Sequence, residues 1–153
     1  MDRPCIMLLR GTSLLSRLIQ WQTRSPYSHA AIVTPSGTVI ESVEGKGVRE
    51  VPIEHAYKHA VYDLFDVSGL SDDQWSDALE WARSKIGSRY DYRGVLRFVS
   101  RRPAELNDKY FCSEFVFAAM LHAGLLLLER IPAHNVSPAI LSYSPSLRLI
   151  QER

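Results

Sequence analysis

Cys112 is one of two cysteines in the chain and stands at the head of an otherwise apolar stretch, YFCSEFVFAAMLHAG. A helix that begins near Cys112 would direct its unpaired N–H groups and the positive end of its dipole at the sulfur. Such a position lowers the pKa of a thiol and favours the nucleophilic thiolate. The same N–H groups could bind a developing oxyanion. The position indicates a nucleophile, and a buried cysteine that only fills space is the simpler alternative.

A cysteine nucleophile needs a base, usually a histidine, and the chain has five histidines. His122 follows Cys112 on the same expected helix, about 15 Å away along the axis, so it cannot be the partner. His55 and His59 are spaced like a pair of metal ligands, but the sequence offers no third ligand. His134 lies in an expected loop. None of these four is therefore predicted to be the base.

His29 differs from the other histidines because it opens SHAAIVT, an expected strand that is apolar on both faces. A polar ring there is either a hydrogen-bonded core residue or a functional group. If PSG is a three-residue hairpin loop with Gly37 left-handed, Ala31 faces Glu41. His29 then lies one diagonal step from Glu41 on the same face. A two-residue loop would send Glu41 to the opposite face, so this pairing depends on the register.

Glu41 would share its face with Val39 and Val43, which is an unusual place for an unpaired carboxylate. A glutamate there could accept a hydrogen bond from one imidazole nitrogen and leave the other nitrogen for a thiol. The alternative is an exposed glutamate at the end of a strand.

Four motifs occur in a characteristic order: YSHAAIV, VIES, GSRYDY and FCSEFV. In this order they resemble the permuted papain-like amidases, the YiiX/YaeF-like branch of the NlpC-type cysteine peptidases. In the unpermuted enzymes the cysteine helix precedes the histidine strand, whereas here His29 comes before Cys112, as circular permutation requires. The resemblance extends from about Pro26 to the tail, where SPAILSYSP is similar in style.

The resemblance implies a cysteine hydrolase that cleaves an amide bond through a thioester intermediate. Carried over by position, it implies that Cys112 is the nucleophile, His29 the base and Glu41 the orienting third residue. It also implies peptidoglycan stem peptides or related cell-wall peptides as substrates. Two alternatives stay open. One is acyl transfer, as in the lecithin:retinol acyltransferase-like enzymes that share the permuted order, and the other is a non-catalytic binding module on the same fold.

The side chain that would complete an oxyanion hole is less defined in the sequence. Tyr90 of GSRYDY is the first candidate, and Tyr27 and Ser113 are the further candidates for contact with the oxyanion or the substrate. A tyrosine in the core or at the rim is the alternative for Tyr90. No metal and no organic cofactor is predicted, because the sequence has no ligand cluster with metal-binding spacing.

The elements that must position these residues begin with strands. Strands are expected at residues 5–11, 28–33, 38–43, 47–53 and 60–67. A helix capped by Ser13 and running to about Gln22 interrupts them. Its apolar residues are expected on one stripe, formed by Leu14, Leu15, Leu18 and Ile19.

Helices are expected in the second half of the chain. The capping box SDDQ at 71–74 begins one that ends at Gly87, with five buried side chains: Trp75, Ala78, Leu79, Ala82 and Ile86. A shorter helix at 93–100, the helix of Cys112, one further turn and a final strand complete the chain. Strands followed by helices indicate an α+β fold, with an antiparallel sheet and helices packed on one side. With the resemblance, this becomes a circularly permuted papain-like fold.

Composition limits the possible functions. The length of 153 residues fits a single hydrolase domain over 1–153. A net charge of +1 argues against a protein that binds nucleic acid through phosphates. Two cysteines are too few for a disulfide scaffold, and Cys5 is expected to pack in a buried strand.

The N-terminal residues MDRPCIMLLRG lack the pattern of a signal peptide, and AGLLLL is too short to cross a bilayer. We therefore expect synthesis in the cytoplasm and no stable insertion into a membrane. The expected partner is a peptide or a peptidoglycan fragment, and phage lysis and an injection system are two candidate routes of delivery to a cell wall. The sequence makes no prediction of oligomeric state.

Overall fold

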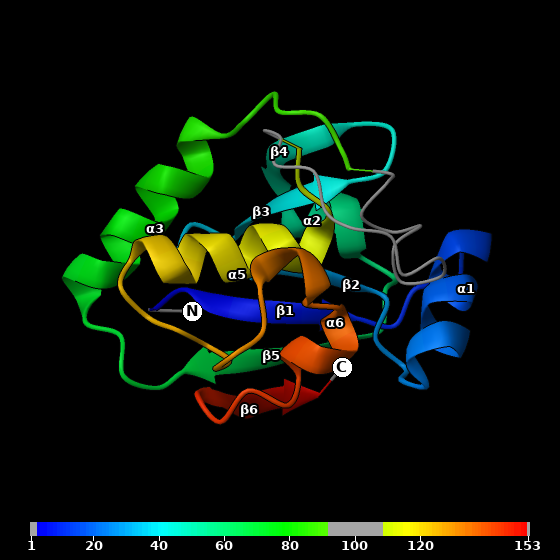
Figure 1. Cartoon of the computed structure of the whole chain (residues 1–153). Coiled ribbons are helices and arrows are strands. Elements are labelled where there is room, and N and C mark those ends of the chain that lie inside the picture. Colours follow the sequence, from blue (N-terminus) through cyan, green and yellow to red (C-terminus); the bar gives the residue numbers. More distant parts are fainter. Residues whose placement is uncertain (1–2, 92–108, 153) are drawn as a thin grey trace.

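A six-stranded antiparallel sheet forms the centre of the computed structural model, which describes residues 3–91 and 109–152 (Figure 1). The strand order is β4-β3-β2-β1-β5-β6. The strands are β1 (Cys5–Leu9), β2 (His29–Val33), β3 (Thr38–Val43), β4 (Gly47–Pro52), β5 (Tyr62–Val67) and β6 (Leu147–Glu152). The helices are α1 (Leu14–Thr23), α2 (Ile53–Tyr57), α3 (Asp72–Ser84), α5 (Cys112–His122), the 3-10 helix η1 (Ala133–Asn135) and α6 (Pro138–Leu141). The α+β class is confirmed, and the helix expected at 93–100 lies outside the described residues.

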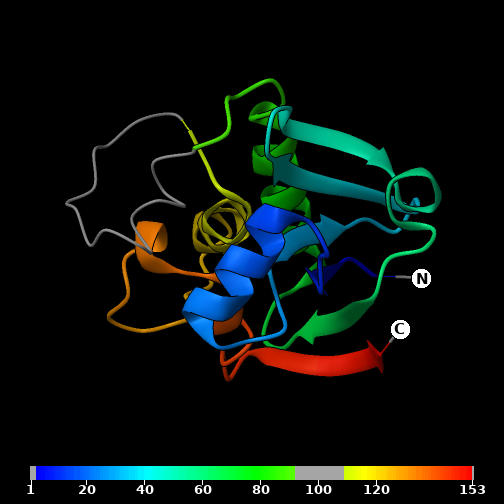
Figure 2. The ribbon, with the colours of Figure 1, turned by 90° about the vertical axis from the view of Figure 1, so that its right-hand side faces the viewer.

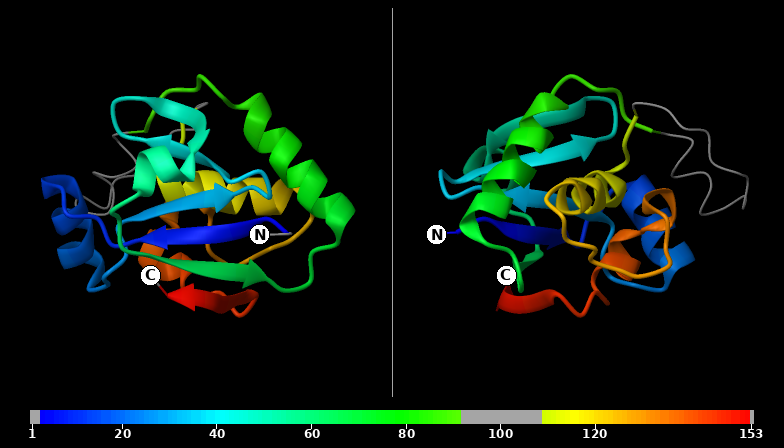
Figure 3. Two further views of the ribbon diagram at one scale, coloured as in Figure 1. Left: turned by 180° about the vertical axis from the view of Figure 1, so that it is seen from behind. Right: turned by 60° about the vertical axis from the view of Figure 1, so that its left-hand side comes forward.

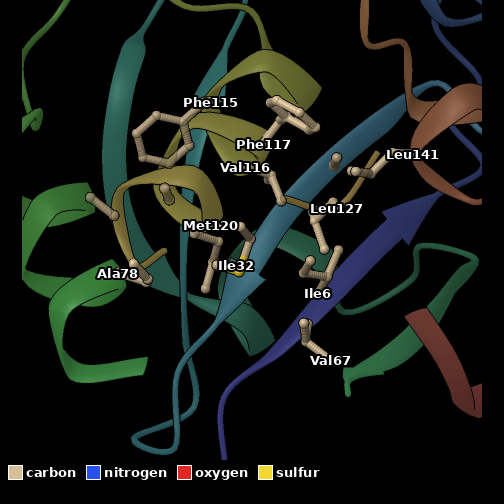
Figure 4. Close-up of a cluster of buried hydrophobic side chains, with 14 of the residues drawn as sticks. Ile6, Ile32, Val67, Ala78, Phe115, Val116, Phe117, Met120, Leu127 and Leu141 are labelled. Atoms are coloured by element: carbon tan, nitrogen blue, oxygen red, sulfur yellow. The ribbon is translucent and has the colours of Figure 1, made fainter. Parts of the chain in front are cut away.

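The main core lies between the sheet and the helices α3, α5 and α6, which cover one face (Figures 1 and 3). Figure 4 shows this core, a cluster that includes Ile6 and Ile32 of the sheet and Phe115 and Met120 of α5. The predicted packing of helices on one side holds for these three helices. The short α2 lies against the opposite face, where its Tyr57 packs on a smaller buried cluster.

The central strand β1 is apolar throughout because it is buried on both faces. Ile6 and Leu8 point into the main core, whereas Cys5, Met7 and Leu9 point into the smaller cluster. A strand covered on both sides has no solvent-facing positions, which explains the uninterrupted sequence CIMLL.

The hairpin between β2 and β3 sets the position of Glu41. Ile32 pairs with Ile40, Val33 pairs with Val39, and Gly37 is left-handed with φ of 78°. This is the register that a three-residue loop predicts, since continuing it by one residue places Ala31 opposite Glu41. His29 and Glu41 therefore lie on the same face of the sheet, one diagonal step apart.

Helix α1 begins as predicted, because the Ser13 hydroxyl accepts a hydrogen bond from the N–H of Ser16 at 3.1 Å. Its apolar residues do not form the single stripe that we expected. Ile19 is buried and Leu15 is half-buried against the rest of the molecule. Leu14 and Leu18 lie on the outer side and are 88% and 40% exposed, because the helix packs on one side only.

Helix α3 begins at the predicted capping box. The Ser71 hydroxyl accepts the N–H of Gln74 at 3.2 Å, and the Gln74 side chain accepts the N–H of Ser71 at 3.1 Å. Of the five side chains expected to be buried, Trp75, Ala78 and Ala82 are buried. Ile86 is 48% exposed, because α3 ends at Ser84 and the chain then turns away through Gly87.

The segment at Gly87 and Ser88 packs closely against β4 at Gly47. The N–H of Val48 donates to the Ser88 carbonyl, and the N–H of Gly87 donates to the Val48 carbonyl, both at 2.9 Å. Gly47 has φ of 73°, and a Cβ there would overlap the Ser88 carbonyl oxygen. Gly37 has a similar φ but open space around its Cβ position.

We expect Gly37→Ala to lower the free energy of unfolding by about 1–2 kcal/mol, the usual cost of a left-handed alanine. Gly47→Ala should cost more, because the new methyl group must also displace the Ser88 backbone. Urea denaturation of both variants measures the difference. Equal losses would contradict the close packing of β4 against Ser88.

Candidate active site

Cys112 is the first residue of α5 and its side chain is buried. Its sulfur accepts backbone hydrogen bonds from Ala30 on β2 and from Ser113 in the first turn of α5. Both the start of a helix and two N–H donors favour the negatively charged form of the sulfur. The structure therefore places Cys112 where a thiolate is stabilised.

The N–H of Ala30 reaches Cys112 because β2 and β3 separate at this point. The β1–β2 pairing continues to Leu9 and His29, whereas the recorded β2–β3 pairs are Ile32–Ile40 and Val33–Val39. N–H groups alternate in direction along a strand, and that of Thr34, the residue after β2, points toward β3. The even-numbered residues of β2 share this direction. The N–H of Ala30 points in the same direction and reaches the sulfur of Cys112.

Two contacts hold the chain that enters α5 at this opening. The Ser42 hydroxyl on β3 donates to the Tyr110 carbonyl at 2.6 Å. Tyr110 also forms a parallel bridge with Tyr90, which belongs to the GSRYDY motif. Cys112 follows two residues later, so its position is fixed by both β3 and this motif.

His29 connects Cys112 with Glu41. Its Nε2 lies 2.7 Å from Oε2 of Glu41, and its ring also hydrogen-bonds to Cys112. Because Nε2 is occupied by Glu41, Nδ1 is the nitrogen left to face the sulfur. The structure thus brings together the three residues that the sequence singled out.

The charges of Cys112 and His29 stabilise each other. Burial disfavours the charged imidazolium, but the negative charge of Cys112 and hydrogen bonds to Cys112 and Glu41 raise the pKa of His29 to about 10. Burial also raises the pKa of Cys112, but the positive charge and hydrogen bond of His29, with the N–H groups of Ala30 and Ser113, lower it overall. This geometry favours a thiolate–imidazolium pair at neutral pH.

Glu41 is fully buried and its carboxylate is surrounded by donors. Arg49 donates to Oε1 through Nε at 3.0 Å and through a terminal nitrogen at 2.8 Å. His29 and the hydroxyl of Tyr57 share Oε2. Burial disfavours the carboxylate, but these hydrogen bonds and the His29 charge lower the pKa of Glu41 overall. Glu41 is therefore held ionised and fixed in orientation.

Arg49 and Tyr57 were missed by the sequence analysis. Arg49 is directly opposite Glu41 in the β3–β4 pairing, so a register for that hairpin would have identified it. Tyr57 comes from α2, which lies on the opposite face of the sheet from α5. In EHAYKHA the spacing of the two histidines was the only signal, and it does not indicate a role for Tyr57. Burial and the Glu41 charge raise the pKa of Tyr57, so its hydroxyl remains a proton donor.

A cavity of about 200 Å³ is lined in part by His29. Tyr90 lines this cavity and packs in one buried cluster with Cys112, Phe111 and Ile19. Leu15 of α1 lines the same cavity. Tyr90 is therefore the one of the three secondary candidates whose side chain lies beside both Cys112 and the cavity.

The other two secondary candidates use their hydroxyl groups elsewhere. Tyr27 donates to Asp63 on β5 at 2.5 Å, next to Arg10. Ser113 is fully buried and donates to the Val136 carbonyl at 2.6 Å. Both hydroxyls thus donate to groups of the protein itself, whereas the backbone N–H of Ser113 faces the sulfur. A contact of Tyr27 or Ser113 with an oxyanion or a substrate stays a prediction.

The described residues contain neither a cluster of metal ligands nor a membrane-spanning helix. Within residues 3–91 and 109–152, no three His, Cys, Asp or Glu side chains are grouped so that they could hold a metal ion. In the same residues, no helix combines the length and the apolar character needed to cross a bilayer.

Comparison with known proteins gives a family and a fold. A family model described as "Permuted papain-like amidase enzyme, YaeF/YiiX, C92 family" matches residues 6–146. The crystal structure of the metalloprotein yiiX from Escherichia coli O157:H7 has a TM-score of 0.79 at 22% sequence identity. The similarity covers 99% of this chain and 97% of that chain, so the two proteins share their fold. A search of curated proteins gave no match.

We expect iodoacetamide to alkylate Cys112 much faster than Cys5 at neutral pH. The pKa of Cys112 is lowered, whereas burial raises the pKa of Cys5 to about 12. The rate at Cys112 should stay high below the ordinary thiol range and fall only when its thiolate is protonated. Peptide mass spectrometry over a pH series measures both rates.

The control for this experiment is His29→Ala, which removes the positive charge beside the sulfur. Its alkylation profile should move to higher pH, since only the N–H groups of Ala30 and Ser113 then oppose the effect of burial on the pKa of Cys112. Equal labelling of both cysteines, or an unchanged profile in His29→Ala, would show that the pair does not exist.

We expect Glu41→Gln to slow turnover by roughly tenfold to a thousandfold, because the imidazolium loses its charged partner. The free energy of unfolding should also fall by about 1–3 kcal/mol, because Arg49 then faces a neutral amide. The alkylation profile of Cys112 should move to higher pH. Thermal or urea unfolding and the pH series together separate loss of stability from loss of orientation.

Glu50→Gln is the matched control, because Glu50 also binds an arginine through two nitrogens. Arg83 donates to it at 3.0 and 3.1 Å, outside the site. This variant should leave the Cys112 profile unchanged. A shift of equal size in both variants would mean that Glu41 acts only through general stability.

Proposed function

The chain belongs to the permuted papain-like amidase family, and from this membership we propose that it is a cysteine hydrolase that cleaves amide bonds through a thioester. The observation that supports this most strongly is the hydrogen-bonded series Cys112–His29–Glu41. It combines a stabilised thiolate, a base whose tautomer is fixed and a carboxylate that orients the base. These are the roles that nucleophilic catalysis by cysteine requires.

In the proposed first half-reaction, the Cys112 thiolate attacks the amide carbonyl and forms a tetrahedral intermediate. We propose that N–H groups at the start of α5 stabilise its oxyanion, with Tyr90 as a further donor. His29 then gives its Nδ1 proton to the leaving amine as the C–N bond breaks. The products of this step are a free amine and a thioester on Cys112.

In the second half-reaction, water attacks the thioester carbonyl. Neutral His29 accepts a proton from that water, and the C–S bond breaks to release a carboxylic acid and restore the thiolate. Glu41 does not exchange a proton in either step. Its charge stabilises the imidazolium, and its hydrogen bond keeps Nδ1 directed at the reacting atoms.

We propose cell-wall peptides, such as peptidoglycan stem peptides, as the substrate class. The family description as an amidase supports an amide substrate. The cavity beside His29 supports a peptide, since its walls combine apolar side chains such as Leu15 and Ile19 with the polar groups of Ser28 and Glu44. A cavity of about 200 Å³ has room for one side chain next to the scissile bond rather than for a large cofactor.

Incubation with purified muropeptides, followed by mass spectrometry, tests this function. We expect cleaved products that have gained one water, and no products with Cys112→Ala, which should fold because one small buried side chain replaces another. His134→Ala, a histidine variant outside the site, should keep full activity. Cleavage by Cys112→Ala would refute the proposed mechanism.

The same experiment separates hydrolysis from its alternatives. An acyl group that stays on Cys112 until an amine or alcohol acceptor is added would indicate acyl transfer. Complete absence of both cleavage and acylation, with any peptide tested, would indicate a binding module.

A further inference from the structure

Helix α1 has two different apolar sides. On its inner side, Ile19 packs with Tyr90 and Cys112, and Leu15 adds to the same cluster. On its outer side, Leu14 and Trp21 are 88% and 73% exposed. The inner side thus forms part of the active-site wall, and the outer side needs a separate explanation.

The outer residues form one continuous face. Leu14, Leu18 and Trp21 follow a spacing of four and three residues, which places them within a narrow arc of an α-helix. Isolated exposed leucines are common on protein surfaces, but three large apolar side chains on one ten-residue helix form a patch. Figure 2 shows α1 in front of the rest of the ribbon, so its outer face is directed away from the sheet.

Two arginines lie beside this patch: Arg17, three residues after Leu14 on α1, and Arg24, the C-cap residue that follows the helix. Arg17 and Arg24 are both exposed, and the segment LLSRLIQWQTR contains no acidic residue. Within the described residues, no carboxylate forms an ion pair with either guanidinium. The whole chain carries a net charge of only +1, so this positive charge is a local feature.

We propose that the outer face of α1 docks on an anionic lipid surface and holds the active-site cavity, which lies on the inner side of this helix, close to that surface. Tryptophan and leucine insert at the boundary between head groups and acyl chains, and arginines bind anionic head groups. A helix that lies flat on a surface needs this combination and not the length of a spanning helix.

The position of α1 gives the docking a consequence. Leu15, Ser16 and Ile19 line the cavity beside His29, and they lie on the same helix as the docking face. A protein held through α1 would therefore keep this cavity within about one helix diameter of the lipid surface. The proposal concerns where the protein works, and it does not depend on which amide is cleaved.

Cosedimentation of the full chain with vesicles tests the proposal. We expect binding to vesicles of phosphatidylcholine mixed with phosphatidylglycerol, much weaker binding to phosphatidylcholine alone, and loss of binding as salt rises. The double variant Leu14→Ala, Trp21→Ala should bind roughly tenfold more weakly or worse. Arg17→Gln with Arg24→Asn should weaken binding and remove its salt dependence, and asparagine suits the left-handed backbone of Arg24 (φ 51°).

The matched control changes exposed apolar residues elsewhere, Tyr143→Ala with Ile150→Ala, which are 77% and 51% exposed. This control should bind vesicles like the wild type. All variants should keep the wild-type alkylation rate of Cys112, which shows that fold and site are intact. Equal binding by the α1 variants, or no binding by the wild type, would overturn the proposal. Self-association without lipid that the α1 variants abolish would also overturn it, because the face would then bind a second copy.

Discussion

The active site depends on the buried carboxylate of Glu41. A buried charge is stable only when it is paired, and four hydrogen bonds from His29, Arg49 and Tyr57 provide that pairing. The result is a row of alternating charges, in which Arg49 and His29 are positive and Glu41 and Cys112 are negative. Each group is stabilised by its neighbours, so removal of one changes the ionisation of the others. The donors come from β2, β4 and α2, so the carboxylate also ties three elements together.

A second constraint concerns how the two halves of the site meet. His29 and Glu41 point to the face of the sheet that carries the smaller cluster, whereas α5 packs on the opposite face. Cys112 reaches His29 because β2 and β3 separate beyond their last recorded pair and free the N–H of Ala30. The catalytic residues therefore come from both faces of the sheet, and they meet where β2 and β3 separate. The hydrogen bond from Ser42 to Tyr110 holds α5 at that point.

Features that depend on local chemistry were accessible from the sequence. The loop containing Gly37 set the register of Glu41, and the apolar context singled out His29. Features that depend on long-range packing were not accessible. Tyr57 approaches Glu41 from α2, and no local pattern indicates that approach. Arg49 is an intermediate case, because the register of the β3–β4 hairpin places it opposite Glu41. The spacing of leucines in α1 suits packing on either side, so it could not show that Leu14 faces outward.

The ionisation of Cys112 tests the central claim most directly. Ultraviolet absorbance of the thiolate can be titrated as the difference between the wild type and Cys112→Ala. The account predicts a pKa of Cys112 clearly below the value of about 8.5 for a free cysteine, and a higher pKa in Glu41→Gln. A pKa at or above that of free cysteine in the wild type would contradict the account. A pKa that Glu41→Gln does not change would also contradict it, because the row of charges would then not control the nucleophile.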